Sequence, residues 1–259
     1  MSTILQYHQR YLTILHIKQK LEGVHLDAEI WKRRAAEAAA KLVRDKMVVG
    51  LGSGTTVAEI IRALAKLNPK ATFVPSSSTT QRLASDLGLK LSSLDVHDKL
   101  DLAIDGADEV DPNFNMIKGG GGAHTREKIV AGAAERVVIV VDRTKLVRKL
   151  GERSPVPVEV LPFAREYTAR RLAELGGEPK LRIATSGAPF ITDDGNYILD
   201  VKFRSIPKPA ELEQKINRVP GVVENGIFVD VADIVLVGYN EGCKTLRTKR
   251  NFLDFLAAR

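Results

Sequence analysis

The segment VVGLGSGTTVAEII, residues 48–61, combines a short apolar run, three closely spaced glycines and a helical spacing of apolar residues. This order predicts a buried strand that enters a tight turn and continues into a helix. Backbone N–H groups at a helix N-terminus bind a phosphate or a carboxylate well, and Ser53, Thr55 and Thr56 add three hydroxyl groups. The same residues also fit an ordinary turn between a strand and a helix, so this segment alone leaves the ligand open.

The glycine spacing argues against two nucleotide-binding loops. A dinucleotide fingerprint requires G-x-G-x-x-G and an acidic residue about 20 positions later. Here Gly50, Gly52 and Gly54 are spaced G-x-G-x-G, and the next predicted strand ends in FVPSSST without a carboxylate. The Gly-Lys-Ser/Thr of a P-loop does not follow either. We therefore predict that the chain uses no cofactor.

Apolar runs and helical segments alternate up to about residue 149. The runs ATFVP, LDLAID and RVVIVVD are continuous, which is typical of parallel strands covered on both faces. This alternation predicts a doubly wound, Rossmann-like parallel-sheet domain of the α/β class. The run DIVLVGY, residues 233–239, is expected to return to the same sheet.

The pattern changes after residue 150. A strand, a helix, two strands, a helix and a strand at 222–230 follow one another, which is the order of a ferredoxin-like α+β unit. The expected domains are a Rossmann-like catalytic domain and a smaller inserted ferredoxin-like domain, with the ligand between them. Their expected boundaries are 27–150 with 231–259 for the first, 151–230 for the second, and 1–26 for a helical N-terminal extension.

The composition narrows the class of partner. No apolar run approaches the ~18 residues that a membrane span needs, which predicts no membrane partner. Much of the excess positive charge, +7 overall, lies at 31–46 and 244–252 without interleaved aromatic residues. We therefore predict an anionic small substrate and no nucleic-acid partner. The single cysteine, Cys243, excludes an internal disulfide and fits a cytoplasmic location.

Acidic residues dominate the first part of the segment DLAIDGADEVDPNFNMIKGGGGAHTREKI, residues 101–129. Asp105, Asp108 and Glu109 follow a predicted buried strand, at the edge where α/β folds place their ligand sites. Acidic side chains at this edge are able to hold sugar hydroxyls or to exchange protons with them.

The second part of this segment supplies a cation, a glycine run and a further carboxylate. Lys118 precedes four glycines, 119–122, and Glu127 lies in the first turn of the helix that follows. Consecutive glycines let backbone N–H groups approach a ligand oxygen. A glutamate base beside a lysine and amide donors suits proton transfer next to a carbonyl. Glu127 also fits a helix-terminal carboxylate without a catalytic role.

Metal binding is not predicted. The carboxylates of DGADEVD lack calcium-loop spacing, and no two histidines stand four positions apart. His124 stands beside the glycines and either touches the site or packs in the interior.

Five segments together resemble the ribose-5-phosphate isomerase A family. They occur in the order of that family, and the resemblance spans about residues 27–247; the segment 220–238 is most similar to archaeal members. The five segments are residues 50–56, 105–129, 141–147, 155–162 and 193–203.

The resemblance implies an isomerase that interconverts D-ribose 5-phosphate and D-ribulose 5-phosphate, in the non-oxidative pentose phosphate pathway. It implies a metal-independent reaction through a cis-enediolate and a homodimer or homotetramer. Glu127 is the implied catalytic base, with Asp105 and Lys118 as its catalytic partners. The implied substrate-binding residues are Lys32, Ser53, Gly54, Thr55, Thr56, Asp105, Gly106, Ala107, Asp108, Lys118, Gly119, Gly120, Gly121 and Lys145.

Two other classes of protein remain as alternatives. A sugar-phosphate sensor on the same fold would carry an N-terminal helix-turn-helix, for which the first 25 residues are too few. An acyl-CoA transferase on a related fold would use a glutamate nucleophile and a longer chain. The pair Lys118 and Glu127 favours isomerisation over the sensor.

Overall fold

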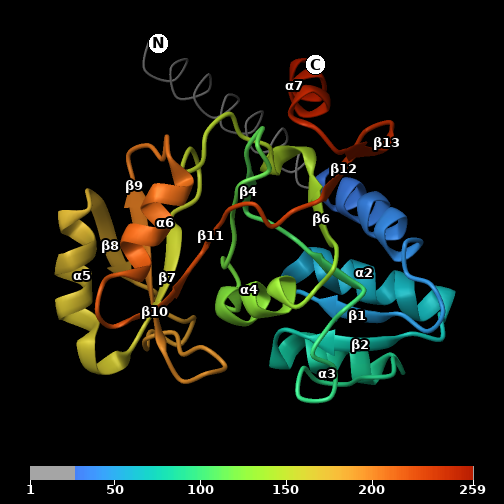
Figure 1. Ribbon diagram of the computed structural model, residues 1–259, viewed down its shortest axis with the longest axis horizontal. Coiled ribbons are helices and arrows are strands. Elements are labelled where there is room, and N and C mark those ends of the chain that lie inside the picture. The colour runs from blue at the N-terminus through green and yellow to red at the C-terminus, as the bar shows by residue number, and fades with distance from the viewer. Residues whose placement is uncertain (1–26, 259) are drawn as a thin grey trace, which may run out of the picture.

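The computed structural model describes residues 27–258 and places a six-stranded sheet at the centre of its larger part (Figure 1). The strand order is β13-β12-β6-β3-β1-β2, and within the described residues only β13 runs antiparallel to its neighbour. The predicted doubly wound α/β class is confirmed. The strands are β1 Val48–Leu51, β2 Thr72–Pro75, β3 Leu102–Asp105, β6 Val137–Asp142, β12 Ile234–Tyr239 and β13 Gly242–Leu246.

Helices cover both faces of this sheet. Adjacent strand residues alternate between two cores, so that Ile104 packs in the first and Ala103 in the second. This double burial is why the strands read as continuous apolar runs. The first core contains the helix at residues 27–40, α2 Gly54–Leu67 and α3 Ser78–Asp86, and the second contains α4 His124–Gly132 and α7 Lys249–Ala257.

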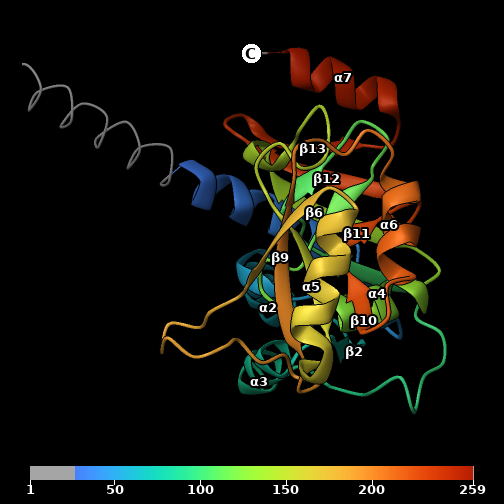
Figure 2. The same cartoon turned by 90° about the vertical axis from the view of Figure 1, so that its left-hand side faces the viewer.

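A second, antiparallel sheet has the order β10-β7-β9-β8, which is the strand order of the predicted ferredoxin-like unit. Its two long helices lie side by side on one face, where both contribute to the same core (Figure 2). The elements are β7 Val156–Val160, the short 3₁₀ helix Pro162–Ala164, α5 Arg165–Glu174, β8 Gly177–Leu181, β9 Tyr197–Phe203, α6 Pro209–Asn217 and β10 Val222–Asn225. We propose that this sheet defines the inserted domain at 151–230.

A third small sheet, which the sequence did not indicate, lies between the other two (Figure 1). Its strands are β4 Glu109–Val110, β5 Met116–Ile117 and β11 Ile227–Phe228, in the order β11-β5-β4. The single strand expected at 222–230 is therefore wrong: it divides into β10 and β11, which belong to different sheets.

Gly226 explains this division. Its N–H donates to the carbonyl of Pro157 at 2.7 Å, and its own carbonyl accepts from the N–H of Lys118 at 2.9 Å. A Cβ atom at this position would lie 2.2 Å from the carbonyl oxygen of Lys118, so a side chain does not fit. Through Gly226, the backbone thus links β7 of the four-stranded sheet, called here the small sheet, to Lys118.

The expected N-terminal extension, residues 1–26, lies outside the described residues. Within residues 27–258, no helix is both long and apolar enough to cross a membrane.

Candidate active site

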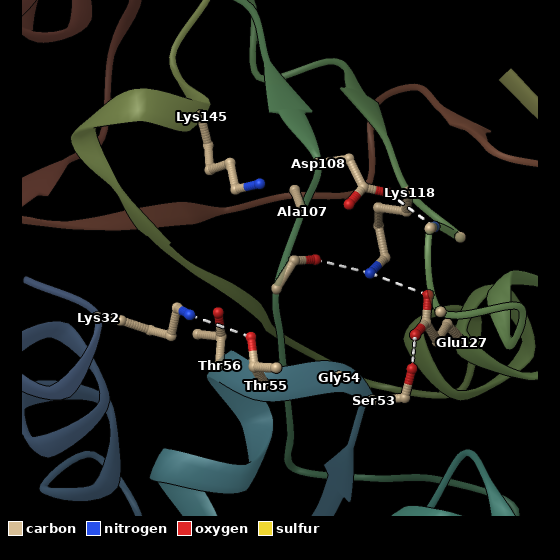
Figure 3. A pocket seen from close by; sticks show the side chains of 14 residues that line it. Lys32, Ser53, Gly54, Thr55, Thr56, Ala107, Asp108, Lys118, Glu127 and Lys145 are labelled. Carbon is tan, nitrogen blue, oxygen red and sulfur yellow. Dashed lines mark hydrogen bonds and ion pairs between the residues drawn. The ribbon is translucent and has the colours of Figure 1, made fainter. Parts of the chain in front are cut away.

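The predicted site residues converge at the carboxyl edge of the large sheet (Figure 3). Every one of them except Asp105 lines a single pocket of about 130 Å³, and Asp105 is in direct contact with a lining residue, Lys118. The lining residues are Lys32, Ser53, Gly54, Thr55, Thr56, Gly106, Ala107, Asp108, Lys118, Gly119, Gly120, Gly121, Glu127 and Lys145.

One end of the pocket is formed by the turn at residues 53–56, which follows β1. Helix α2 begins at Gly54, whose φ of +84° lies in a region that glycine adopts readily. The first N–H groups of a helix have no partner within the helix, so they are available to an anion here. The hydroxyls of Thr55 and Thr56 belong to the same first turn.

Two lysines face this turn. The ammonium of Lys32 lies 3.1 Å from the hydroxyl of Thr55 and 2.6 Å from Glu29. Lys145 lines the pocket from the 3₁₀ helix Arg143–Lys145, which follows β6. In Figure 3, Lys32 and Lys145 lie on one side of the pocket, and Lys118 and Glu127 lie on the other.

The other end holds a buried charged cluster of Asp105, Lys118 and Glu127. The ammonium of Lys118 lies 2.8 Å from Asp105 Oδ2 and 3.0 Å from Glu127 Oε2. It also donates to the carbonyl of Gly106 at 2.6 Å, while the hydroxyl of Ser53 donates to Glu127 Oε1 at 2.5 Å. The three charged residues are each at most 7% exposed, so water screens these charges poorly.

The charges of this cluster shift all three pKa values. Burial and the neighbouring Glu127 raise the pKa of Asp105 to about 7, against the opposing effect of Lys118. Burial alone would also raise the pKa of Glu127, but the Lys118 ammonium and the hydrogen bond from Ser53 outweigh it and hold that pKa below its usual range. Burial alone would lower the pKa of Lys118, but the two carboxylates raise it. At neutral pH the cluster therefore contains an ionised Glu127, a charged Lys118 and a partly protonated Asp105.

Gly52 makes room for this cluster. A Cβ atom on Gly52 would lie 1.8 Å from Asp105 Oδ1, so any side chain would displace that carboxylate. Asp105 Oδ1 also accepts from the N–H groups of Gly106 at 2.7 Å and Ser53 at 3.3 Å. The sequence indicated glycines for phosphate binding here, whereas one of them accommodates a carboxylate.

Two residues of the segment 101–129 have structural roles in the protein interior. Glu109, which the sequence placed with the ligand-site acids, is fully buried away from the pocket. It accepts from the backbone N–H groups of Gly151 at 2.7 Å, Arg153 at 2.6 Å and Ser154 at 2.6 Å, which fixes the chain as it leaves the large sheet. His124 is also fully buried and packs against Gly119.

Arg182 is a residue near the site that sequence reasoning missed. It follows β8 of the small sheet, and its guanidinium donates to the carbonyls of Gly119 and Gly120. Its only sequence signal is a charged residue after an apolar position, PKLR, which does not distinguish it from a surface arginine.

No group of three or more His, Cys, Asp or Glu side chains within residues 27–258 is arranged to hold a metal ion. The expected independence from metal and cofactor stays a prediction.

A titration experiment tests the electrostatics of the cluster. Because the folded-state pKa of Asp105 is about 7, above its ordinary 3.8, its protonated form stabilises the fold below pH 4, and this contribution is lost as the pH rises through 7. Asp105→Asn should remove that dependence, on the order of a few kcal/mol between pH 4 and pH 8. Urea unfolding across this range measures it. Asp86→Asn, at an exposed position, is the control and should leave the wild-type slope; an unchanged slope in Asp105→Asn would contradict the assignment.

Comparisons with known proteins place the chain in a family. The family model described as "Ribose 5-phosphate isomerase A (phosphoriboisomerase A)" matches residues 72–242. A ribose-5-phosphate isomerase A of Thermosynechococcus vestitus is 55% identical over 80% of this chain and 90% of its own. One of Pyrococcus abyssi is 45% identical over 85% of this chain and 99% of its own.

Solved structures are similar over the same range. Ribose 5-phosphate isomerase A of Methanocaldococcus jannaschii aligns with a TM-score of 0.81 and 46% identity, covering 85% of this chain and 99% of that one. A D-ribose-5-phosphate isomerase in complex with phospho-erythronic acid aligns with a TM-score of 0.83 and 44% identity, at the same coverage. The chain belongs to the ribose-5-phosphate isomerase A family.

Proposed function

We propose that this protein interconverts D-ribose 5-phosphate and D-ribulose 5-phosphate. The observation that carries the proposal is the buried charged cluster, in which an ionised Glu127 contacts Lys118 at 3.0 Å. The opposite end of the same pocket is lined by the turn at residues 53–56, whose N–H groups and hydroxyls are available to an anion. Membership of the isomerase family and the phospho-erythronic acid bound by one relative support the same substrate class.

The phosphate of the substrate binds at the turn of residues 53–56. The N–H groups and hydroxyls of this turn, together with Lys145 and Lys32, supply donors and positive charge. Binding energy gained at this end places the reacting carbons against the charged cluster.

Glu127 acts as the base. It removes the proton from C2 of the open-chain aldose, and the electron pair forms a C1–C2 double bond while the C1 carbonyl oxygen becomes negatively charged. Lys118 and the N–H groups of Gly119 and Gly121 stabilise that oxygen; both glycines belong to the loop at residues 118–122, called here the glycine loop. A proton then moves from the C2 hydroxyl to the C1 oxygen, and Glu127 returns its own proton to C1 as the C2 carbonyl of ribulose 5-phosphate forms.

Asp105 exchanges protons with the substrate hydroxyls. Its pKa of about 7 means that both of its forms are populated at neutral pH, which is the condition for donating and accepting in one cycle. This property also suits ring opening, which precedes the removal of the C2 proton.

The expected metal independence leads to the assay that tests the function. Protein dialysed against a chelator and supplied with D-ribose 5-phosphate should form ribulose 5-phosphate at the rate of untreated protein. Binding of ribose 5-phosphate without turnover would contradict the proposal and favour a sugar-phosphate sensor.

Removing a cation at the phosphate end should affect binding more than chemistry. Lys145→Ala is expected to raise KM for ribose 5-phosphate about 10- to 100-fold, the value of one charge-assisted hydrogen bond, with kcat changed less than about 3-fold. Steady-state kinetics measure both. Lys149→Ala removes an equal charge from an exposed position four residues away and should leave KM unchanged. A fall in kcat alone for Lys145→Ala would contradict its place at the phosphate.

Three further expectations stay predictions. They are the homodimeric or homotetrameric state, the cytoplasmic location and the similarity of residues 220–238 to archaeal members. Size-exclusion chromatography with light scattering tests the first.

A further inference from the structure

A side chain that follows the four-stranded sheet's strand β8 hydrogen-bonds to the backbone of the glycine loop. Arg182, directly after β8, donates from Nη1 to the carbonyl of Gly119 at 2.9 Å and to the carbonyl of Gly120 at 3.1 Å. Its side chain is 13% exposed and does not line the pocket. Arg182 therefore connects the four-stranded sheet to the backbone of the glycine loop and does not itself form part of the ligand site.

A second residue of the small sheet holds Arg182 in place. This residue is Asp200: Nε of Arg182 donates to Asp200 Oδ2 at 2.9 Å, and Nη2 of Arg182 donates to Asp200 Oδ1 at 2.5 Å. The ring of Phe190 lies 5.7 Å from the guanidinium carbon. The planar fork thus bonds a carboxylate on one side and two consecutive carbonyls on the other, an arrangement that a lysine cannot reproduce.

The bonds of the loop leave two of its N–H groups free for a ligand. The N–H of Gly120 donates to Asp108 at 2.8 Å, and that of Gly122 donates to the carbonyl of Gly119 at 3.0 Å. Within residues 27–258, no protein acceptor takes the N–H groups of Gly119 and Gly121, and both residues line the pocket. Because the carbonyl of Gly120 and the N–H of Gly121 belong to one peptide unit, the bond from Arg182 to that carbonyl restricts rotation of the unit that carries the free N–H of Gly121.

We propose that Arg182, oriented by Asp200, is a positioning residue for the isomerisation. It holds the carbonyls of Gly119 and Gly120 so that the N–H group of Gly121 stays directed at the oxygen that becomes negatively charged. This inference rests on the proposed function. It predicts an effect on the reacting end of the substrate and little effect on the phosphate, which binds at the opposite end of the pocket.

Kinetics of Arg182→Met test the proposal. Loss of the hydrogen bonds from Arg182 to the two carbonyls should lower kcat about 10- to 100-fold, because misplaced N–H donors stabilise the transition state poorly. KM should change less than about 3-fold. Arg182→Lys should fall between this variant and wild type. The control is Arg170→Met, which removes an exposed arginine from α5 and should match wild type.

A second readout separates positioning from a general loss of structure. Phospho-erythronic acid has a planar carboxylate whose two oxygens resemble those of the enediolate, so its affinity for Arg182→Met should fall by about the same factor as kcat. Competitive inhibition by inorganic phosphate, which reports on the turn at residues 53–56, should stay within about 2-fold of wild type. A merely unfolded fraction would reduce the active concentration without changing either inhibition constant.

Asp200→Asn provides an independent variant that keeps the arginine but loosens its hold. It should show the same pattern at smaller size, and it decides the question if Arg182→Met does not fold. Values of kcat and phospho-erythronic acid affinity within 2-fold of wild type in a folded variant would overturn the positioning role while the proposed function stands. An inactive wild-type protein would overturn both.

Discussion

Replacing Glu127 by glutamine is expected to lower kcat for ribose 5-phosphate by about 10²- to 10⁴-fold. Glutamine has the same shape but cannot accept the C2 proton, so the chemical step loses its base. Binding should persist, because the turn at residues 53–56 and Lys145 are untouched. Stopped or coupled assays of ribulose 5-phosphate formation measure the rate, and titration with phospho-erythronic acid measures binding.

The same variant makes a second prediction about Asp105. The Glu127 carboxylate is one of the two causes that raise the pKa of Asp105, so Glu127→Gln should lower that pKa from about 7. Carboxyl ¹³C NMR across pH 4 to 9 measures it. Glu135→Gln, which removes an exposed glutamate after α4, is the matched control for both effects. Full turnover by Glu127→Gln would contradict its role as the base.

Replacing Lys118 by methionine is expected to have an effect of similar size. The substitution leaves Asp105 and Glu127 buried together without a cation, so the pKa of Glu127 should rise and the base should become protonated at neutral pH. The developing enediolate oxygen also loses its charged donor, which is worth about 10²- to 10³-fold in kcat. Together these effects predict a loss of at least 10³-fold at pH 7.

The pH dependence distinguishes the two causes. Residual activity of Lys118→Met should rise with pH as Glu127 ionises, whereas wild-type activity should not depend on this ionisation at neutral pH. Breaking a buried ion pair also costs about 3–5 kcal/mol of stability, so Lys118→Arg, which keeps the charge, serves as the folded comparison. A kcat within 3-fold of wild type in folded Lys118→Met would contradict the account.

Much of the large sheet is readable from the sequence. The runs at β1, β2, β3, β6 and β12 are apolar except at some of their ends, because both faces of the sheet are covered, and each run is a strong local signal. The convergence of the candidate site residues at one edge was predictable for a related reason. Glycines, acids and a lysine follow these strands directly, and the carboxyl ends of parallel strands meet at one edge.

The elements that join the two sheets were not readable. β4, β5 and β11 contain two residues each, which is too short for any periodicity to appear. The break at Gly226 depends on the backbone of Lys118, which lies more than a hundred positions earlier in the chain. The C-terminal segment looked like a basic end, yet α7 buries Phe252 and Phe255 against the sheet and exposes its charges.

The same limit applies to the supporting residues of the site. The role of Gly52 depends on the carboxylate of Asp105, and the role of Arg182 depends on two carbonyls about sixty positions away. Glu109 looks like its acidic neighbours in sequence, but the backbone N–H groups that it satisfies come from a distant loop. Each of these contacts forms only after the chain has folded.

Isomerisation in D₂O tests most directly whether Glu127 carries the proton between C2 and C1. With D-ribose 5-phosphate at equilibrium over many turnovers, proton transfer through Glu127 predicts that deuterium accumulates at C1 of ribulose 5-phosphate and at C2 of ribose 5-phosphate. ¹H NMR detects this accumulation, and in Glu127→Gln both conversion and deuterium uptake should be slower by the same factor of about 10² to 10⁴. Conversion by the wild-type protein without any deuterium at carbon would indicate a direct hydride shift and would contradict the account.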